Sequence, residues 1–105
     1  MKRKDFYEKK LQEIFTPEIP LARLFRTPAG YYLYDTGTNK ILGCREEVFQ
    51  LTAGLLHKPV LRAVDDFLDT YGENEFMDAA GEIIGAVESE NILSAFRASV
   101  HGLSN

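Results

Sequence analysis

The sequence predicts an α+β fold in which one helix precedes a three-stranded antiparallel sheet and three further helices follow. Three observations support this prediction. Two short runs of aromatic and branched residues flank a five-residue turn in the stretch "YYLYDTGTNKILGC", which is typical of a β-hairpin. Apolar residues recur at helical spacing in most of the remaining chain. At 105 residues the chain is long enough to form one domain with a buried core.

The first helix is predicted over residues 5–15, with Asp5 as its N-cap, and the two prolines of "TPEIP" end it. The segment "LARLFRT" then alternates loosely and is followed by the turn "PAG", so a strand begins at Leu21. With Tyr31–Asp35 and Lys40–Cys44 it forms an antiparallel meander. A sheet this small must pack against helices.

Three helical segments follow in close succession: "REEVFQLTAGLL", "VLRAVDDFLDTYG" and "NEFMDAAGEIIGAVESEN". Gly72 is placed where a helix ends and Asn74 where the next one is capped, while Gly54 is a mild flaw in the first segment. The order of elements is that of a winged helix with the sheet ahead of the helices. We expect residues 1–20 to form the first helix and a proline-containing linker, 21–93 the domain, with a turn or strand near 92–96, and 94–105 a tail or the start of a linker.

Composition excludes several classes of site. Cys44 is the single cysteine, so an internal disulfide or a multi-cysteine metal site is excluded within this chain. No apolar run approaches the roughly 20 residues of a membrane span, and the first ten residues lack the apolar core of a signal peptide. We therefore expect a cytoplasmic protein with no membrane partner.

Catalysis has little support in the sequence. His57 and His101 lack metal-binding spacing, and Cys44 has no base beside it. The pairs Glu46-Glu47 and Asp65-Asp66 lie on predicted helices, where adjacent side chains point about 100° apart and are usually solvated. We expect neither catalytic residues nor a cofactor nor a metal.

Nucleic acid is the usual partner of a winged helix, whose last helix enters the major groove. The chain has 12 Lys and Arg against 16 Asp and Glu, a net charge of −4, and the stretch 65–90 has no basic residue. A helix with that charge would repel phosphates. We therefore expect no nucleic-acid partner through this face, although a DNA-binding regulator stays an alternative.

An interaction surface remains, and two features indicate it. The strand Lys40–Cys44 is the last of the meander, so its outer edge exposes backbone groups to an added strand unless the tail or the first helix covers it. On the last helix Gly81 and Gly85 lie inside the helical pattern, where each costs about 1 kcal/mol relative to alanine, so a close neighbour is expected there. That neighbour is either another helix or a guest peptide lying in a groove.

The stretch "GYYLYDTGTNKILGCREEVFQLTAGLL" with the two helices after it resembles the PqqD-like domain known as the RiPP recognition element, as found at the N-terminus of radical SAM peptide maturases. The similarity covers about residues 21–93 and consists of residue types and spacing. The C-x3-C-x2-C cluster motif of the maturases is not present before Asn105. The chain is therefore expected to be either a stand-alone recognition protein or the front of a longer enzyme.

The resemblance implies a non-catalytic domain that binds the leader segment of a ribosomally made precursor peptide and presents it to a modifying enzyme, in cis or in trans. The leader adds as a strand beside the third strand of the sheet and lies against the last helix. An alternative is an assembly module that pairs the same edge with a second copy. The expected peptide-binding residues are Asn39, Lys40, Ile41, Leu42, Gly43, Cys44, Phe76, Met77, Ala80, Gly81, Ile83, Ile84 and Val87.

Overall fold

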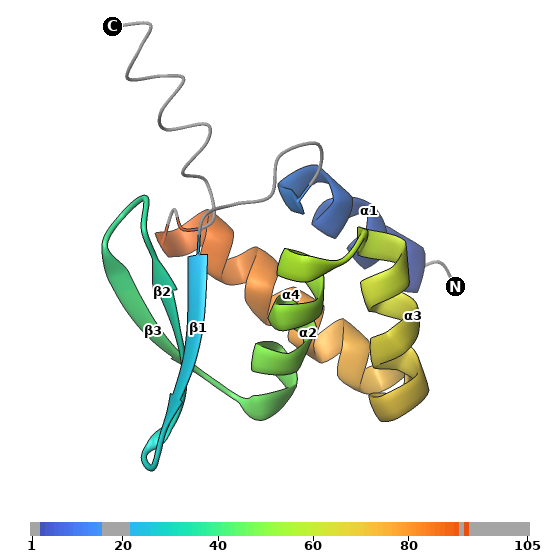
Figure 1. Ribbon diagram of the computed structural model, residues 1–105. Helices are drawn as coiled ribbons and strands as arrows, with labels where there is room; N and C mark the ends of the chain where they lie inside the picture. Colours follow the sequence, from blue (N-terminus) through green and yellow to red (C-terminus); the bar gives the residue numbers. More distant parts are fainter. Residues whose placement is uncertain (1–2, 16–21, 91, 93–105) are drawn as a thin grey trace, which may run out of the picture.

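The computed structural model describes residues 3–15, 22–90 and 92 and shows an α+β domain, as the sequence predicts (Figure 1). One helix precedes a three-stranded antiparallel sheet, and three helices follow it. The predicted order and type of these elements are therefore confirmed. The elements are α1 (Arg3–Phe15), β1 (Ala22–Thr27), β2 (Gly30–Asp35), β3 (Lys40–Cys44), α2 (Glu46–His57), α3 (Val60–Tyr71) and α4 (Glu73–Glu90).

The sheet has the strand order β1-β2-β3 and covers one side of the helices (Figure 1). Its register places Leu24, Leu33 and Leu42 opposite one another across the three strands. Because successive side chains of a strand point to opposite faces, this row faces the helices, and Leu33 is buried. The row beside it faces solvent and includes Ile41, whose side chain is 59% exposed. The predicted meander therefore has one covered face and one open face.

The turn between β2 and β3 is fixed by Asp35, which is fully buried. Its carboxylate accepts hydrogen bonds from the Thr38 backbone N–H and the Thr38 hydroxyl, both at 2.8 Å. Asn39 closes the turn with a φ of 63°, a conformation that asparagine tolerates better than most residues, and its N–H donates to the Asp35 carbonyl at 2.8 Å. These contacts set the position of β3 relative to β2.

The helices form the second layer, in which α2 contacts both the sheet and the other helices. Helix α1 packs against α3 and α4 on the side of the bundle away from the sheet (Figure 1). None of the helices in the described part of the chain is long and apolar enough to cross a membrane. The core residues that are buried are Leu11, Phe15, Leu33, Val48, Leu51, Leu55, Val60, Ala63, Val64, Phe67, Phe76, Ala79, Ala80, Ile83 and Ile92.

Two predicted helix caps are wrong. Helix α1 begins at Arg3, so Asp5 lies in its first turn, where its charge still suits the helix dipole. Helix α4 begins at Glu73, so Asn74 also lies inside a first turn. Gly72 takes both terminal roles: its N–H donates to the Leu68 carbonyl at 3.0 Å, and its carbonyl accepts from the Phe76 N–H at 3.1 Å. Its φ of 90° explains why glycine is required between the two helices.

The closest helix contact at a glycine is between α2 and α3. A Cβ placed on Gly54 would lie 3.2 Å from the Cβ of Ala63, which is tighter than an ordinary contact. Gly54 is therefore a packing residue, and its cost in helix propensity has a structural reason. The predicted proline break at 16–20 and the predicted turn or strand near 92–96 lie, apart from Ile92, outside the described residues.

Candidate functional site

Strand β3 forms one margin of the sheet. It pairs with β2 through the register Asp35 to Lys40 up to Tyr31 to Cys44, and no strand in the described ranges pairs with its other side. In an antiparallel sheet alternate residues of such an edge strand direct their N–H and C=O groups away from the partner. These groups can pair with an added strand.

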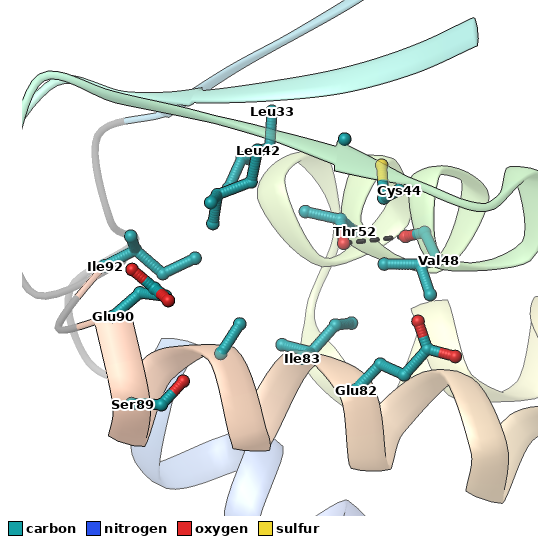
Figure 2. A pocket seen from close by; sticks show the side chains of 12 residues that line it. Leu33, Leu42, Cys44, Val48, Thr52, Glu82, Ile83, Ser89, Glu90 and Ile92 are labelled. Carbon is teal, nitrogen blue, oxygen red and sulfur yellow. Dashed lines mark hydrogen bonds between the residues drawn. The ribbon is translucent and has the colours of Figure 1, made fainter.

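A pocket of about 250 Å³ lies between this strand and α4 (Figure 2). Figure 2 shows Leu33 and Leu42 pointing from the sheet toward the space above Ile83 of α4. Ile92 forms one end of the pocket, beside the last turn of α4. The remaining wall residues come from β3, α2 and α4: Gly43, Cys44, Val48, Thr52, Glu82, Ala86, Ser89 and Glu90.

The inner wall of the pocket is mainly apolar. The hydroxyl of Thr52 donates to the Val48 carbonyl at 2.7 Å, so it is satisfied within α2 and leaves the Thr52 methyl group to line the pocket (Figure 2). No buried side-chain nitrogen or oxygen among the described residues lacks a hydrogen-bond partner. Within the same residues, no group of three or more His, Cys, Asp and Glu side chains could hold a metal ion. Such a pocket suits an aliphatic side chain.

Two ion pairs cross the space between β3 and α4 at its two ends. Lys40 at the start of β3 reaches Glu90, with Nζ 3.1 Å from the carboxylate and 3.0 Å from the Glu90 carbonyl. Arg45, just after β3, lies 2.7 Å from the carboxylate of Glu82. All four side chains are 43–50% exposed, so each pair contributes at most about 1 kcal/mol to stability. A guest could therefore displace either pair at low cost.

Cys44, at the end of β3, is one of the residues that line this pocket (Figure 2). Partial burial, and secondly the negative charge of Glu82, raise the pKa of the Cys44 thiol above its ordinary value. A raised pKa favours the uncharged thiol at neutral pH, which is the poor nucleophile. The chemistry of this side chain is thus that of a small apolar wall residue.

The predicted binding residues of β3 are only partly brought together. Leu42, Gly43 and Cys44 line the pocket. Leu42 and Cys44 are two residues apart, so their side chains point to the same face of the sheet. Ile41 points to the open face of the sheet. Asn39 belongs to the turn, and its side-chain oxygen accepts a hydrogen bond from the hydroxyl of Tyr34. Lys40, the sixth predicted residue, lies at one end of the pocket in its ion pair with Glu90.

On α4 the pocket lies on a different flank from the one that the sequence predicts. Of the predicted residues of this helix, only Ile83 lines the pocket. Phe76 and Ala80 are fully buried in the core. A Cβ on Gly81 would lie 3.8 Å from the ring of Tyr7, so α1 occupies that flank of α4. Of the two neighbours that the sequence allows beside Gly81, another helix or a guest peptide, the structure has the helix. The other predicted residues, Met77, Ile84 and Val87, pack at the margin of the core and do not line the pocket.

Gly85 has open space beside it: apart from its chain neighbours and the adjoining backbone of α4, no atom in the described part of the chain lies within 4 Å of the position that a Cβ would take there. The close approach expected at the two glycines of α4 is therefore found at neither, since the contact at Gly81 is of ordinary length. The tight contact lies instead at Gly54, on α2.

Sequence reasoning missed the residues of the pocket that come from β2, α2 and the other flank of α4. Leu33 could have been found, because the hairpin register places it opposite Leu42. Ala86 follows Ile83 by three residues and shares its side of the helix, which is also a readable signal. Ile92 carries no such signal, because it lies after the last regular element.

The fold and the pocket together define a small α+β domain with an apolar side-chain pocket beside the open edge of a strand. Comparisons of the chain with protein-family models, with curated proteins and with solved structures find no match.

Proposed function

We propose that this chain is a non-catalytic recognition domain that binds an extended peptide by strand addition at β3. The single observation that supports this most strongly is the pocket between β3 and α4, because it lies directly beside the open strand edge. Backbone hydrogen bonds supply affinity in this mode of binding, and pockets for alternate side chains supply selectivity. The domain has both features in one place.

The geometry favours a particular pattern in the guest. A strand added to β3 presents every second side chain to the face of the sheet that bears Leu42, and therefore to the pocket. A volume of about 250 Å³ accommodates one or two aliphatic side chains. We propose a guest with branched apolar residues at alternate positions, two of which enter this pocket.

The charge preference of the guest depends on the two ion pairs at the ends of the pocket. The sequence of α4 favours a guest with basic flanks, but Glu82 and Glu90 already pair with Arg45 and Lys40. A basic guest residue gains from these carboxylates only when a pair opens. The preference is therefore modest and decreases with salt, since all four groups are exposed.

The resemblance to RiPP recognition elements supplies the biological setting of the proposal. The guest is the leader segment of a ribosomally made precursor peptide, and the domain holds it for a peptide-modifying enzyme, such as a radical SAM maturase, acting in cis or in trans. A reducing, cytoplasmic setting belongs to the same proposal. Nucleic acid plays no part in it, because α4 carries acids and no Lys or Arg.

The direct test is a titration of the isotope-labelled domain with short precursor peptides encoded near its gene, followed by amide NMR. We expect shifts in Lys40–Cys44 and in the part of α4 that includes Glu82, Ile83 and Ala86. Shifts that avoid both segments contradict the proposed site. A double-stranded DNA probe in the same titration tests the regulator alternative, and salt-sensitive shifts with DNA alone would favour it.

Proline substitution gives a sharper test with its own control. Ile41 and Leu42 are neighbours, so one of the two directs its N–H toward β2 and the other directs it outward. Proline at the inward position breaks the sheet, whereas proline at the outward position leaves the hairpin intact. We expect the variant that stays folded, judged by its NMR spectrum, to bind at least about fivefold more weakly, since one hydrogen bond contributes about 1 kcal/mol. Unchanged affinity in that variant contradicts strand addition.

A further inference from the structure

Strand β1 forms the second margin of the sheet. It pairs with β2 along all six of its residues, and no strand within the described part of the chain pairs with its other side (Figure 1). Alternate residues of β1 therefore direct N–H and C=O groups outward, as those of β3 do. Among the residues that the structure describes, the small sheet therefore has two open edges, and the proposed function uses one of them.

A hollow of about 540 Å³ lies beside β1, between this strand and α2. Its wall toward the helix is apolar and includes Phe49, Ala53 and Leu56, and Leu24 contributes from the strand. A strand paired with β1 would place every second side chain over this surface. The edge of β1 thus combines backbone groups with an apolar hollow, which is the same combination that β3 has with α4.

The two edges differ in charge. Arg23 and Arg26 are exposed on β1, and neither forms an ion pair with any residue that the structure describes. Arg26 lies over the ring of Tyr31, 5.9 Å from its centre. The residues around the hollow include Arg23 and His57 and no carboxylate. The pocket at β3, by contrast, has Glu82 and Glu90 in its wall.

We infer that the edge of β1 is a second docking site, which binds an acidic extended segment of a partner protein by strand addition. The segment alternates branched apolar residues, which enter the hollow against α2, with Asp or Glu residues, which lie on the open face of the sheet beside Arg23. Arg26 is on the same face as Leu24, over the ring of Tyr31. A second copy of this chain fits less well, because antiparallel pairing of two β1 strands places the arginines of one copy beside those of the other. A six-residue strand buries a small area, so the contact is weak and reversible.

The charge difference favours an acidic strand at β1 over the same strand at β3, so one domain can hold two different strands at once. At the β3 pocket Glu82 and Glu90 are already paired with Arg45 and Lys40, so an acidic strand gains little there. It is attracted more strongly by Arg23 of β1, which has no ion pair with a described residue. The two edges lie on opposite sides of β2, so a strand at β1 and a strand at β3 do not compete for the same backbone groups.

The test uses two synthetic eight-residue peptides with capped ends, one alternating Glu with Val and the other alternating Lys with Val. Each is titrated into the isotope-labelled domain at low salt. We expect the Glu-Val peptide to shift amides in Ala22–Thr27 and in Phe49–His57, and the Lys-Val peptide to bind this edge at least about fivefold more weakly. Equal binding of the two peptides at β1, or shifts of the Glu-Val peptide confined to Lys40–Cys44, would overturn the inference.

Charge reversal supplies a matched pair of variants. Arg23→Glu changes a cation beside the hollow, whereas Lys9→Glu makes the same change at an exposed position of α1. Both substitutions are on the surface, so both variants should fold. We expect Arg23→Glu to weaken binding of the Glu-Val peptide about three- to fivefold at low salt and Lys9→Glu to leave this affinity unchanged. Equal effects of the two variants overturn the inference, as does sedimentation that shows a β1-dependent dimer in place of peptide binding.

Discussion

The neighbouring residues Leu42 and Ile41 allow the proposed groove to be tested with a matched pair of truncations. Both belong to β3, but Leu42 lines the pocket and packs against the core, while Ile41 is 59% exposed on the open face of the sheet. Leu42→Ala removes a wall of the pocket. Ile41→Ala removes a side chain of similar size from the same strand and leaves the pocket unchanged.

The structure sets the expected magnitudes. Truncation of a fully buried leucine typically costs about 2–5 kcal/mol, and Leu42 is only half-buried, so we expect Leu42→Ala to lower the free energy of unfolding by about 1–2 kcal/mol. We expect at most about 0.5 kcal/mol from Ile41→Ala, as for most exposed positions. A guest side chain that contacts Leu42 loses apolar contact worth about 1 kcal/mol, which corresponds to roughly a fivefold change in affinity.

Isothermal titration calorimetry with the bound peptide measures the affinities, and urea unfolding measures the stabilities. We expect Leu42→Ala to weaken binding about fivefold and Ile41→Ala to change it less than about twofold. Both proteins must be folded under the titration conditions, which the urea curves establish. The proposed groove is refuted when Ile41→Ala weakens binding as much as Leu42→Ala does, because the guest would then contact the open face of the sheet.

Three further predictions concern the fold and the pocket wall. Gly81→Ala should raise the free energy of unfolding in urea by about 0.5–1 kcal/mol through helix propensity. Gly54→Ala should lower it, because the new Cβ would lie 3.2 Å from the Cβ of Ala63. The reverse order of the two stabilities would contradict the packing between α2 and α3. Asp35→Ala should lower the free energy of unfolding by about 1–3 kcal/mol in thermal melts, since the turn before β3 loses two hydrogen bonds; a melt like that of the wild type would contradict this role. Cys44 should react with iodoacetamide more slowly at pH 8 than free cysteine does, because the pKa of its thiol is raised and less thiolate is present. Bound peptide should slow the reaction further, and mass spectrometry measures the rate. A rate that peptide does not change would place the guest elsewhere.

The elements of the fold could be predicted because each carries a local signal. The alternation in "YYLYDTGTNKILGC" and the helical spacing after Cys44 both depend on residues that are close in sequence. The cap of α4 was harder to predict from the sequence, because Gly72 both ends α3 and begins α4. This dual role leaves no separate cap residue for α4.

On the strand side of the candidate site, Leu42, Gly43 and Cys44 could be predicted from the sequence, whereas on the helix side only Ile83 was. Helical periodicity identifies an apolar stripe on α4, but it does not say which flank of the stripe α1 covers and which one faces the sheet. Gly81 and Ala86 are five residues apart and therefore about 140° apart around the helix. Tyr7 of α1 faces the first, and the pocket includes the second. That choice is made by tertiary packing between segments far apart in sequence, since α4 contacts α1 on one flank and faces β3 on the other.

Amide hydrogen exchange of β3, with and without bound peptide, tests the central claim most directly. We expect the outward amides of Lys40–Cys44 to exchange readily in the free domain, since they have no strand partner, while the alternate amides bonded to β2 are protected. Bound peptide should protect the outward set and leave the other set nearly unchanged. Outward amides that are already protected in the free domain, or that remain unprotected when peptide is bound, would contradict strand addition at β3.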